Sequence, residues 1–144
     1  FPEERFDKIS RMAQRVFTVP FAGISFVEGE RQWFKSKQGL PVGDSARDLS
    51  FCGHAITSDD VFVVEDAALD PRFAQNPLVL EEPHIRFYAA QPIRGPGGHN
   101  IGTLCIMDKA PREFSDADQE TLRDLGEMVE KEIKVKTRVE GPPD

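Results

Sequence analysis

Residues 21–28 read FAGISFVE and residues 101–108 read IGTLCIMD, and these two stretches decide the fold. Both have the aromatic and branched composition of β-strands, in which successive side chains point to opposite faces. In the first stretch, Phe21 and Val27 lie on one face and Ile24 and Phe26 on the other. In the second stretch, Ile101 and Met107 lie on one face and Leu104 and Ile106 on the other. A sheet that is apolar on both faces must be covered on both.

Hydrophobic periodicity places the other elements around these two strands. The apolar residues of 3–18 recur at helical spacing, and Pro20 ends that helix. A second helix is expected at about 115–138, where Ser115 and Asp118 resemble a capping box. The remaining strands are expected at 31–38, which returns from a tight turn at Gly29, and at 61–64 and 86–94. Pro92 cannot donate a ladder hydrogen bond, so we expect a bulge or a sheet edge there.

The two terminal helices are expected to cover only one face of the sheet, because their short connections place them side by side. Residues 40–85 must then cover the other face. They are rich in Pro, Asp and Gly and are expected to be mostly irregular. Loops over a sheet pack less regularly than helices and tend to leave a concave site. The sequence therefore predicts an α+β fold with a pocket between the sheet and this middle segment.

Composition and charge exclude several classes of protein. The 144 residues are sufficient for one domain, with 39% hydrophobic and 30% charged residues. A net charge of −7 disfavours nucleic-acid binding, which needs a basic face. No stretch approaches the ~20 apolar residues of a membrane span. Residues 1–18 are charged throughout, unlike a signal peptide, so we expect a cytoplasmic protein without membrane contact. Because the chain begins with Phe1, we expect a segment of something longer.

Reactive side chains concentrate in residues 50–56, SFCGHAI, which are expected to form a short helix. Cys52 and His54 are two positions apart and would point about 200° apart on that helix, so they form a poor thiolate–imidazole pair. The only other thiol is Cys105, and no cysteine or histidine spacing matches a zinc motif. We therefore expect two reduced, mostly structural thiols and no metal site.

A second cluster occupies the acidic middle of the chain. Residues 57–85 hold seven acids and one base, Arg72. This pattern is typical of a solvated loop, and the alternative is a site for a cationic or metal-bearing ligand. Phe73 and Tyr88 are large residues that we expect to pack on the sheet, with Tyr88 lining a pocket. Arg86 is either a partner for an anion or a buried brace to Asp66.

Seven stretches of the chain, spread over residues 6–133, resemble bacterial GAF domains found in diguanylate cyclases and sensor histidine kinases. They are RQWFKS (31–36), SFCGHAI (50–56), VVEDA (63–67), DPRFA (70–74), NPLV (76–79), IRFYA (85–89) and IGTLCIMD (101–108). The resemblance implies an antiparallel sheet of five or six strands, with terminal helices on one face and a ligand pocket on the other. It also implies that those helices carry dimerisation and signal output.

The resemblance does not identify a ligand. Members of the family bind cyclic nucleotides, bilins, haem or small metabolites. The Asn-Lys-X-Phe-Asp-Glu signature of cyclic-nucleotide binding is absent, and the Cys-His pair that attaches bilin is absent because Gly53 follows Cys52. Free methionine-(R)-sulfoxide reductases are an enzymatic branch of the family, and Phe51-Cys52-Gly53 matches their cysteine pattern in part. The second thiol of that branch has no counterpart in residues 75–85.

Three functions remain open. The first is a non-catalytic sensory module, residues 1–138 with 139–144 as linker or tail, that binds a small cytosolic ligand or relays dimer geometry to a C-terminal cyclase or kinase. The second is a structural homodimerisation domain whose pocket is filled by Phe73, Phe87 and Tyr88. The third is a reductase-like enzyme that uses Cys52 and Cys105. No cofactor is predicted, and the pocket residues expected for the first function are Ser50, Cys52, His54, Asp66, Phe73, Arg86, Tyr88, Thr103 and Cys105.

Overall fold

The computed structural model describes residues 4–28, 31–39, 50–57 and 59–139. The predicted turn at Gly29 and residues 40–49 of the predicted cover lie outside the described residues. The elements along the chain are α1 (Glu4–Phe17), β1 (Phe21–Glu28), β2 (Arg31–Gln38), α2 (Ser50–Ala55), β3 (Phe62–Val64), the 3-10 helix η1 (Ala67–Leu69), α3 (Pro77–Leu80), β4 (Phe87–Arg94), β5 (Asn100–Asp108) and α4 (Asp116–Val139).

The strands form one antiparallel sheet of five in the order β2-β1-β5-β4-β3. The two stretches that are apolar on both faces, β1 and β5, are neighbours near its centre. Their register pairs Phe21 with Met107 and Ile24 with Leu104. Central strands are buried on both faces, which explains why their sequences do not alternate between apolar and polar residues.

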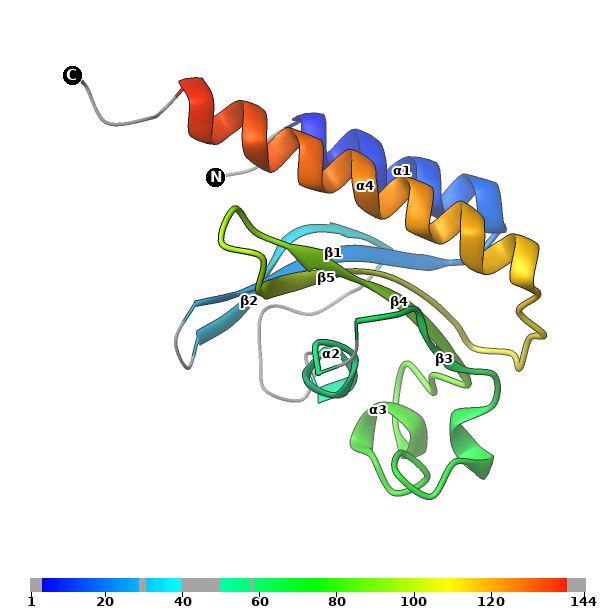
Figure 1. The fold of residues 1–144 in the computed structure, drawn as a ribbon. Coiled ribbons are helices and arrows are strands. Elements are labelled where there is room, and N and C mark those ends of the chain that lie inside the picture. The colour runs from blue at the N-terminus through cyan, green and yellow to red at the C-terminus, as the bar shows by residue number, and fades with distance from the viewer. Residues whose placement is uncertain (1–3, 29–30, 40–49, 58, 140–144) are drawn as a thin grey trace.

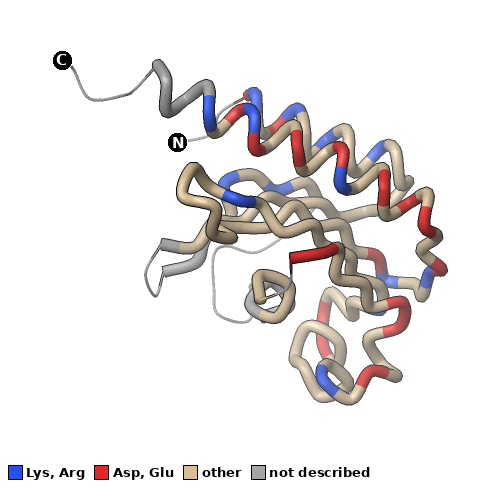
Figure 2. Tube along the Cα trace, viewed as in Figure 1, with Lys and Arg blue, Asp and Glu red and all other residues tan. Residues whose placement is uncertain are grey.

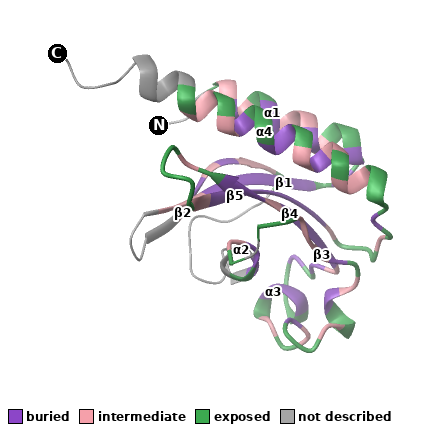
Figure 3. Ribbon diagram, viewed as in Figure 1, coloured by how far each residue is buried: buried purple, intermediate pink, exposed green. Residues whose placement is uncertain are grey.

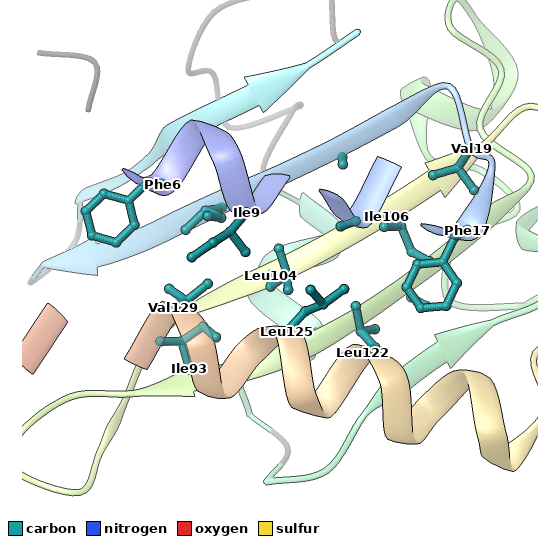
Figure 4. Packing of buried hydrophobic residues seen from close by; sticks show 14 of the residues in the cluster. Phe6, Ile9, Phe17, Val19, Ile93, Leu104, Ile106, Leu122, Leu125 and Val129 are labelled. Carbon is teal, nitrogen blue, oxygen red and sulfur yellow. The ribbon is translucent and has the colours of Figure 1, made fainter. Parts of the chain in front are cut away.

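Both terminal helices lie on one face of the sheet, as predicted (Figure 1). They run side by side, and the Arg5 guanidinium of α1 donates to the Glu132 carbonyl of α4 at 3.4 Å. Their apolar stripes pack with the sheet into a helix-side core, shown in Figure 4. Its fully buried members include Phe6 and Ala13 of α1, Leu122 and Val129 of α4, and Ile24, Leu104 and Ile106 of the sheet.

The opposite face carries the short elements α2, η1 and α3 (Figure 1). The described part of residues 40–85 is mostly irregular, as predicted, with α2, β3, η1 and α3 as short segments within it. Local capping explains two of these turns, because Asp66 accepts from the Ala68 N–H at 3.1 Å and Asn76 accepts from the Leu78 N–H at 2.8 Å. These elements bury a second apolar cluster, here called the aromatic-side core. Figure 3 shows the strands between the two layers largely buried.

The start of α4 has the capping box that the sequence predicts. The Ser115 hydroxyl accepts from the Asp118 N–H at 3.1 Å, and the Asp118 carboxylate accepts from the Ser115 N–H at 3.0 Å.

The expectation for Pro92 also holds. β3 pairs with β4 only as far as Ala90, so no β3 residue pairs with Pro92, and a bulge follows at Ile93 and Arg94.

Thr18 follows the last residue of α1 and has a φ of 52°, a left-handed conformation that disfavours a β-branched residue. We expect Thr18→Gly to raise the free energy of unfolding by about 0.5–1 kcal/mol, because relief of this strain outweighs the added freedom of the unfolded chain. Urea unfolding followed by circular dichroism measures the change. Thr121→Gly, inside α4, is the control and should destabilise; an equal gain in both variants would contradict the explanation.

Candidate functional site

Three stacked aromatic rings occupy the space between α2 and the sheet. The Phe51 ring of α2 stacks on Tyr88 of β4 with centroids 4.9 Å apart, and on Phe73 with centroids 4.4 Å apart. All three side chains are at most 1% exposed. Phe73 and Tyr88, predicted to line a pocket, therefore contact another ring of the same chain. Phe51 was missed as a stacking partner, although its position within the reactive cluster of residues 50–56 was a signal.

Phe87 was predicted to help fill the pocket, and this is wrong. It precedes Tyr88 in β4, so its side chain points to the opposite face and joins the helix-side core. Its ring lies 5.5 Å from that of Phe114, between centroids. The alternation of a strand makes it impossible for two adjacent residues such as Phe87 and Tyr88 to fill the same pocket.

His54 lies at the outer end of the aromatic stack. Its ring makes a T-shaped contact with Phe73, with centroids 4.9 Å apart and an interplanar angle of 76°, and the residue is exposed. Arg72 flanks the same stack, 5.3 Å from the Phe73 centroid, and forms two hydrogen bonds to the Asp70 carboxylate at 3.0 and 2.7 Å. The structure therefore brings His54 and Phe73 together. Ser50 and Cys52 are part of α2, and the structure describes their backbone but not their side chains.

Asp66 and Arg86 form the brace that the sequence suggested, at a partly exposed position. Two parallel hydrogen bonds of 2.7 and 2.8 Å join the guanidinium to the carboxylate, with 37% of the Arg86 and 17% of the Asp66 side chain exposed. Hydrogen bonds from Arg86 are the main reason that the pKa of Asp66 lies below its ordinary value. Arg86 is thus engaged by a carboxylate, which disfavours the alternative that it binds an anionic ligand.

This ion pair predicts a pH dependence. The pKa of Asp66 is lowered in the folded protein, so its contribution to stability is present above 3.8, the ordinary value, and is lost as the pH falls toward the folded pKa. We expect Asp66→Asn, which keeps an N-cap acceptor for Ala68, to cost about 1 kcal/mol at pH 7 because solvent screens the partly exposed pair. Urea unfolding at pH 7 and below 3.8 tests this.

The matched control for this prediction is Asp59→Asn, since Asp59 is 80% exposed and lies 3.8 Å from Arg94. The control should change the free energy of unfolding little at any pH. A deficit in Asp66→Asn that stays constant from neutral to acidic pH would contradict a role for the ion pair.

The sheet side of the predicted site is polar at its centre. Thr103 of β5 and Ser25 of β1 are cross-strand neighbours, with their hydroxyl oxygens 2.8 Å apart. Ser25 is 2% exposed, whereas Thr103 and the adjacent Cys105 are 0% exposed. Cys105 belongs to the aromatic-side core, so strand alternation puts Thr103 on the same face. Ser25 was missed, although it shares a face with Phe21 by the same alternation.

The acidic segment is held by ion pairs to bases within and beyond it. Asp60 pairs with Arg123 at 3.0 Å, Asp66 with Arg86, and Asp70 with Arg72. Figure 2 shows acidic residues on these loops and on the start of α4. Among the described residues, no three His, Cys, Asp or Glu side chains gather as a metal ion would require. These pairs favour a structural role over a cation site for much of the segment.

An open depression of about 540 Å³ lies beside β3, away from the ring stack. Of the predicted site residues, only Asp66 contributes to it; the lining consists of Val63, Val64, Glu65, Asp66, Leu69, Asp70, Pro71, Phe114 and Gln119. It therefore does not correspond to the pocket predicted between the sheet and residues 40–85.

The layered fold, with paired terminal helices on one face and short helices on the other, defines a class of α+β domains. A family model of the GAF domain matches residues 2–133. The chain belongs to the GAF domain family, and the resemblance read from the sequence is confirmed.

One curated relative is a cyclic di-GMP phosphodiesterase of Pseudomonas aeruginosa. It is 46% identical over 110 residues, which cover 76% of this chain. The match spans 19% of the length of that relative, so most of the relative has no counterpart in this chain.

Two solved structures illustrate the similarity of fold. The GAF domain of an Acinetobacter phosphoenolpyruvate-protein phosphotransferase has a TM-score of 0.73 and 18% identity, covering 95% of this chain and 84% of the other. Free methionine-R-sulfoxide reductase from Neisseria meningitidis has a TM-score of 0.75 and 18% identity, covering 93% and 78%. Identities this low establish the fold alone. None of the described helices is long and apolar enough to cross a bilayer.

Proposed function

We propose that this chain is the regulatory module of a larger signalling protein that makes or degrades cyclic di-GMP. The observation that carries the proposal is the 46% identity to a small part of a cyclic di-GMP phosphodiesterase. In this role the module responds to a small cytosolic molecule, or to the geometry of a dimer, and passes the change through α4 to a C-terminal output domain. The module itself carries out no chemistry.

The Ser25–Thr103 pair is the proposed polar contact for the small molecule. It lies on the face opposite α1 and α4, where the sheet offers buried hydroxyl groups on the same face as the aromatic stack. A buried hydroxyl can donate and accept, so it can orient a polar group of a ligand held among apolar side chains. His54 marks the exposed end of the same layer.

A thermal-shift experiment tests the binding role. The probes are cyclic di-GMP, GTP, cyclic AMP, cyclic GMP and free methionine sulfoxide, each at millimolar concentration. A ligand at ten times its Kd adds about 1.4 kcal/mol, which raises the midpoint of a domain of this size by about 5 °C. No shift with any probe would overturn binding of these compound classes.

A matched pair of double variants locates the site. Ser25→Ala with Thr103→Val should abolish the shift. Ser10→Ala with Ser36→Ala should retain it, because that buried hydroxyl pair, 2.7 Å apart, joins α1 to the sheet on the opposite face. Loss of the shift in both would show a general effect of destabilisation and would contradict the assignment.

The aromatic stack favours a second candidate function, a homodimerisation domain without ligand, because Phe51, Phe73 and Tyr88 already fill space between α2 and the sheet.

In both candidate functions the terminal helices form the homodimer interface. Val16 of α1 is 56% exposed and Met128 of α4 is 36% exposed, which gives these helices apolar contacts to offer. Sedimentation velocity should show a dimer that Val16→Asp with Met128→Asp converts to monomer; an unchanged dimer would contradict this interface.

A further inference from the structure

The described residues between α2 and β3, here called the crossing, pass from one face of the sheet to the other. Phe51 and Ala55 of α2 belong to the aromatic-side core, whereas Val61, just before β3, packs against the helix-side core. The chain enters β3 at Phe62, which pairs with Ala90 of β4, and the Ile56 carbonyl at the start of the crossing lies 3.0 Å from the Asn100 amide of β5. This is the side of the sheet on which residues between α2 and β3 can reach α4.

Asp60, within this crossing, is bound directly to α4. Its carboxylate accepts hydrogen bonds from Nε and Nη2 of Arg123 at 3.3 and 3.0 Å. The same oxygen accepts from the Val61 N–H at 2.8 Å, so the side chain is held by its own backbone at one end and by α4 at the other. That backbone hydrogen bond, followed by the one from Arg123, lowers the pKa of Asp60.

A second set of contacts joins the same elements through the β4–β5 hairpin. The Asn100 amide donates to the carbonyl of Ile56, immediately after α2, at 3.0 Å. On the other side of the hairpin, the Arg94 N–H donates to the Glu130 carboxylate of α4 at 2.7 Å. Asn100 and Arg94 are register partners, so the two contacts meet at one rung of the ladder.

We propose that these contacts, Asp60–Arg123 and Ile56–Asn100/Arg94–Glu130, couple α2 to α4 around the edge of the sheet. They form an edge link by which a displacement of α2 changes the stability of α4 on the sheet, and the reverse. The link rests on the proposed function only in naming a ligand as the natural cause of the displacement. The coupling itself is a property of the chain without ligand.

Energetic coupling between two elements is reciprocal, and a link of exposed polar contacts contributes a modest coupling free energy. The sheet separates the two cores, and these polar contacts pass around its edge from the end of α2 to α4. Gly126 of α4 lies so close to β4 that an added Cβ would stand 2.5 Å from the Gln91 Cγ. α4 therefore rests tightly on the strand that ends at Arg94.

Hydrogen exchange on the whole chain without ligand tests the edge link. In Arg123→Gln, amides of α2 should exchange about two- to fivefold faster than in wild type, the range that loss of one exposed ion pair gives. The control is Arg11→Gln, which removes an ion pair with Glu4 within α1. Exchange in α2 should be unchanged in that control, and α3 should be unchanged in both variants.

The double variant Arg123→Gln with Asn100→Ala interrupts both routes and should accelerate exchange in α2 more than either replacement alone. Unfolding in urea verifies that each variant is folded, and exchange is compared only below its transition. Wild-type exchange in α2 of the folded double variant would overturn the proposal. That result would leave the binding proposal standing, since the thermal-shift experiment tests binding separately.

Discussion

Replacement of Phe73 by Ala is expected to lower the free energy of unfolding by about 3–5 kcal/mol. The side chain is 1% exposed and stacks on Phe51 with ring centroids 4.4 Å apart. It also meets the edges of Phe62 and His54. The replacement would remove an aromatic ring from the middle of a four-ring contact and leave a cavity that these neighbours cannot close without leaving their own positions.

Urea unfolding, followed by circular dichroism and by the fluorescence of the single tryptophan, Trp33, measures this loss. Leu69→Ala is the control, because Leu69 is 78% exposed and should change stability by less than about 0.5 kcal/mol. A loss below about 1 kcal/mol in Phe73→Ala would show that the aromatic layer is loosely packed. It would also remove the reason to favour a ligand-free domain.

Gly102→Ala is the second replacement with a large expected effect. A Cβ at this position of β5 would stand 2.0 Å from the Ser25 carbonyl oxygen and 2.7 Å from Cδ1 of Phe26. The first of these atoms is backbone of the neighbouring central strand, so only a shift of β1 relative to β5 could relieve the overlap. We expect a loss of about 3 kcal/mol or more, above the ordinary cost of an overpacked core.

Gly97→Ala is the control for this replacement. An added Cβ in that turn would lie 3.6 Å from the His99 ring, which is an ordinary contact. The two variants should therefore differ by several °C in thermal midpoint, as followed by circular dichroism. Near-equal midpoints would contradict the close approach of β1 and β5 at this rung.

Much of the fold was predictable from the sequence because its signals are local. The apolar faces of β1 and β5, the stripes of α1 and α4, and the capping box at Ser115 each lie within one element. The assignment of Phe87 to the pocket failed despite a local signal, since its adjacency to Tyr88 already requires opposite faces. The mostly irregular cover was predicted, but the short helix α3 within it was not, because it depends on a cap that periodicity does not reveal.

The site was predictable only in part. Asp66 and Arg86 were suggested as a pair, and Thr103 and Cys105 were placed on the same side of β5 as the predicted pocket. The partners that give these residues their roles were not evident. Phe51 stacks on both Phe73 and Tyr88, which follow it by 22 and 37 positions, and no periodicity relates residues that far apart.

The sequence by itself determined that the sheet is covered on both faces and that two helices flank it, because apolar side chains at regular spacing must leave water wherever they occur. The tertiary structure alone decided which polar groups meet, as with the hydroxyls of Ser25 and Thr103 or the charges of Asp60 and Arg123. Hydrogen bonds and ion pairs require a specific distance and direction, and only the assembled strands and helices provide these.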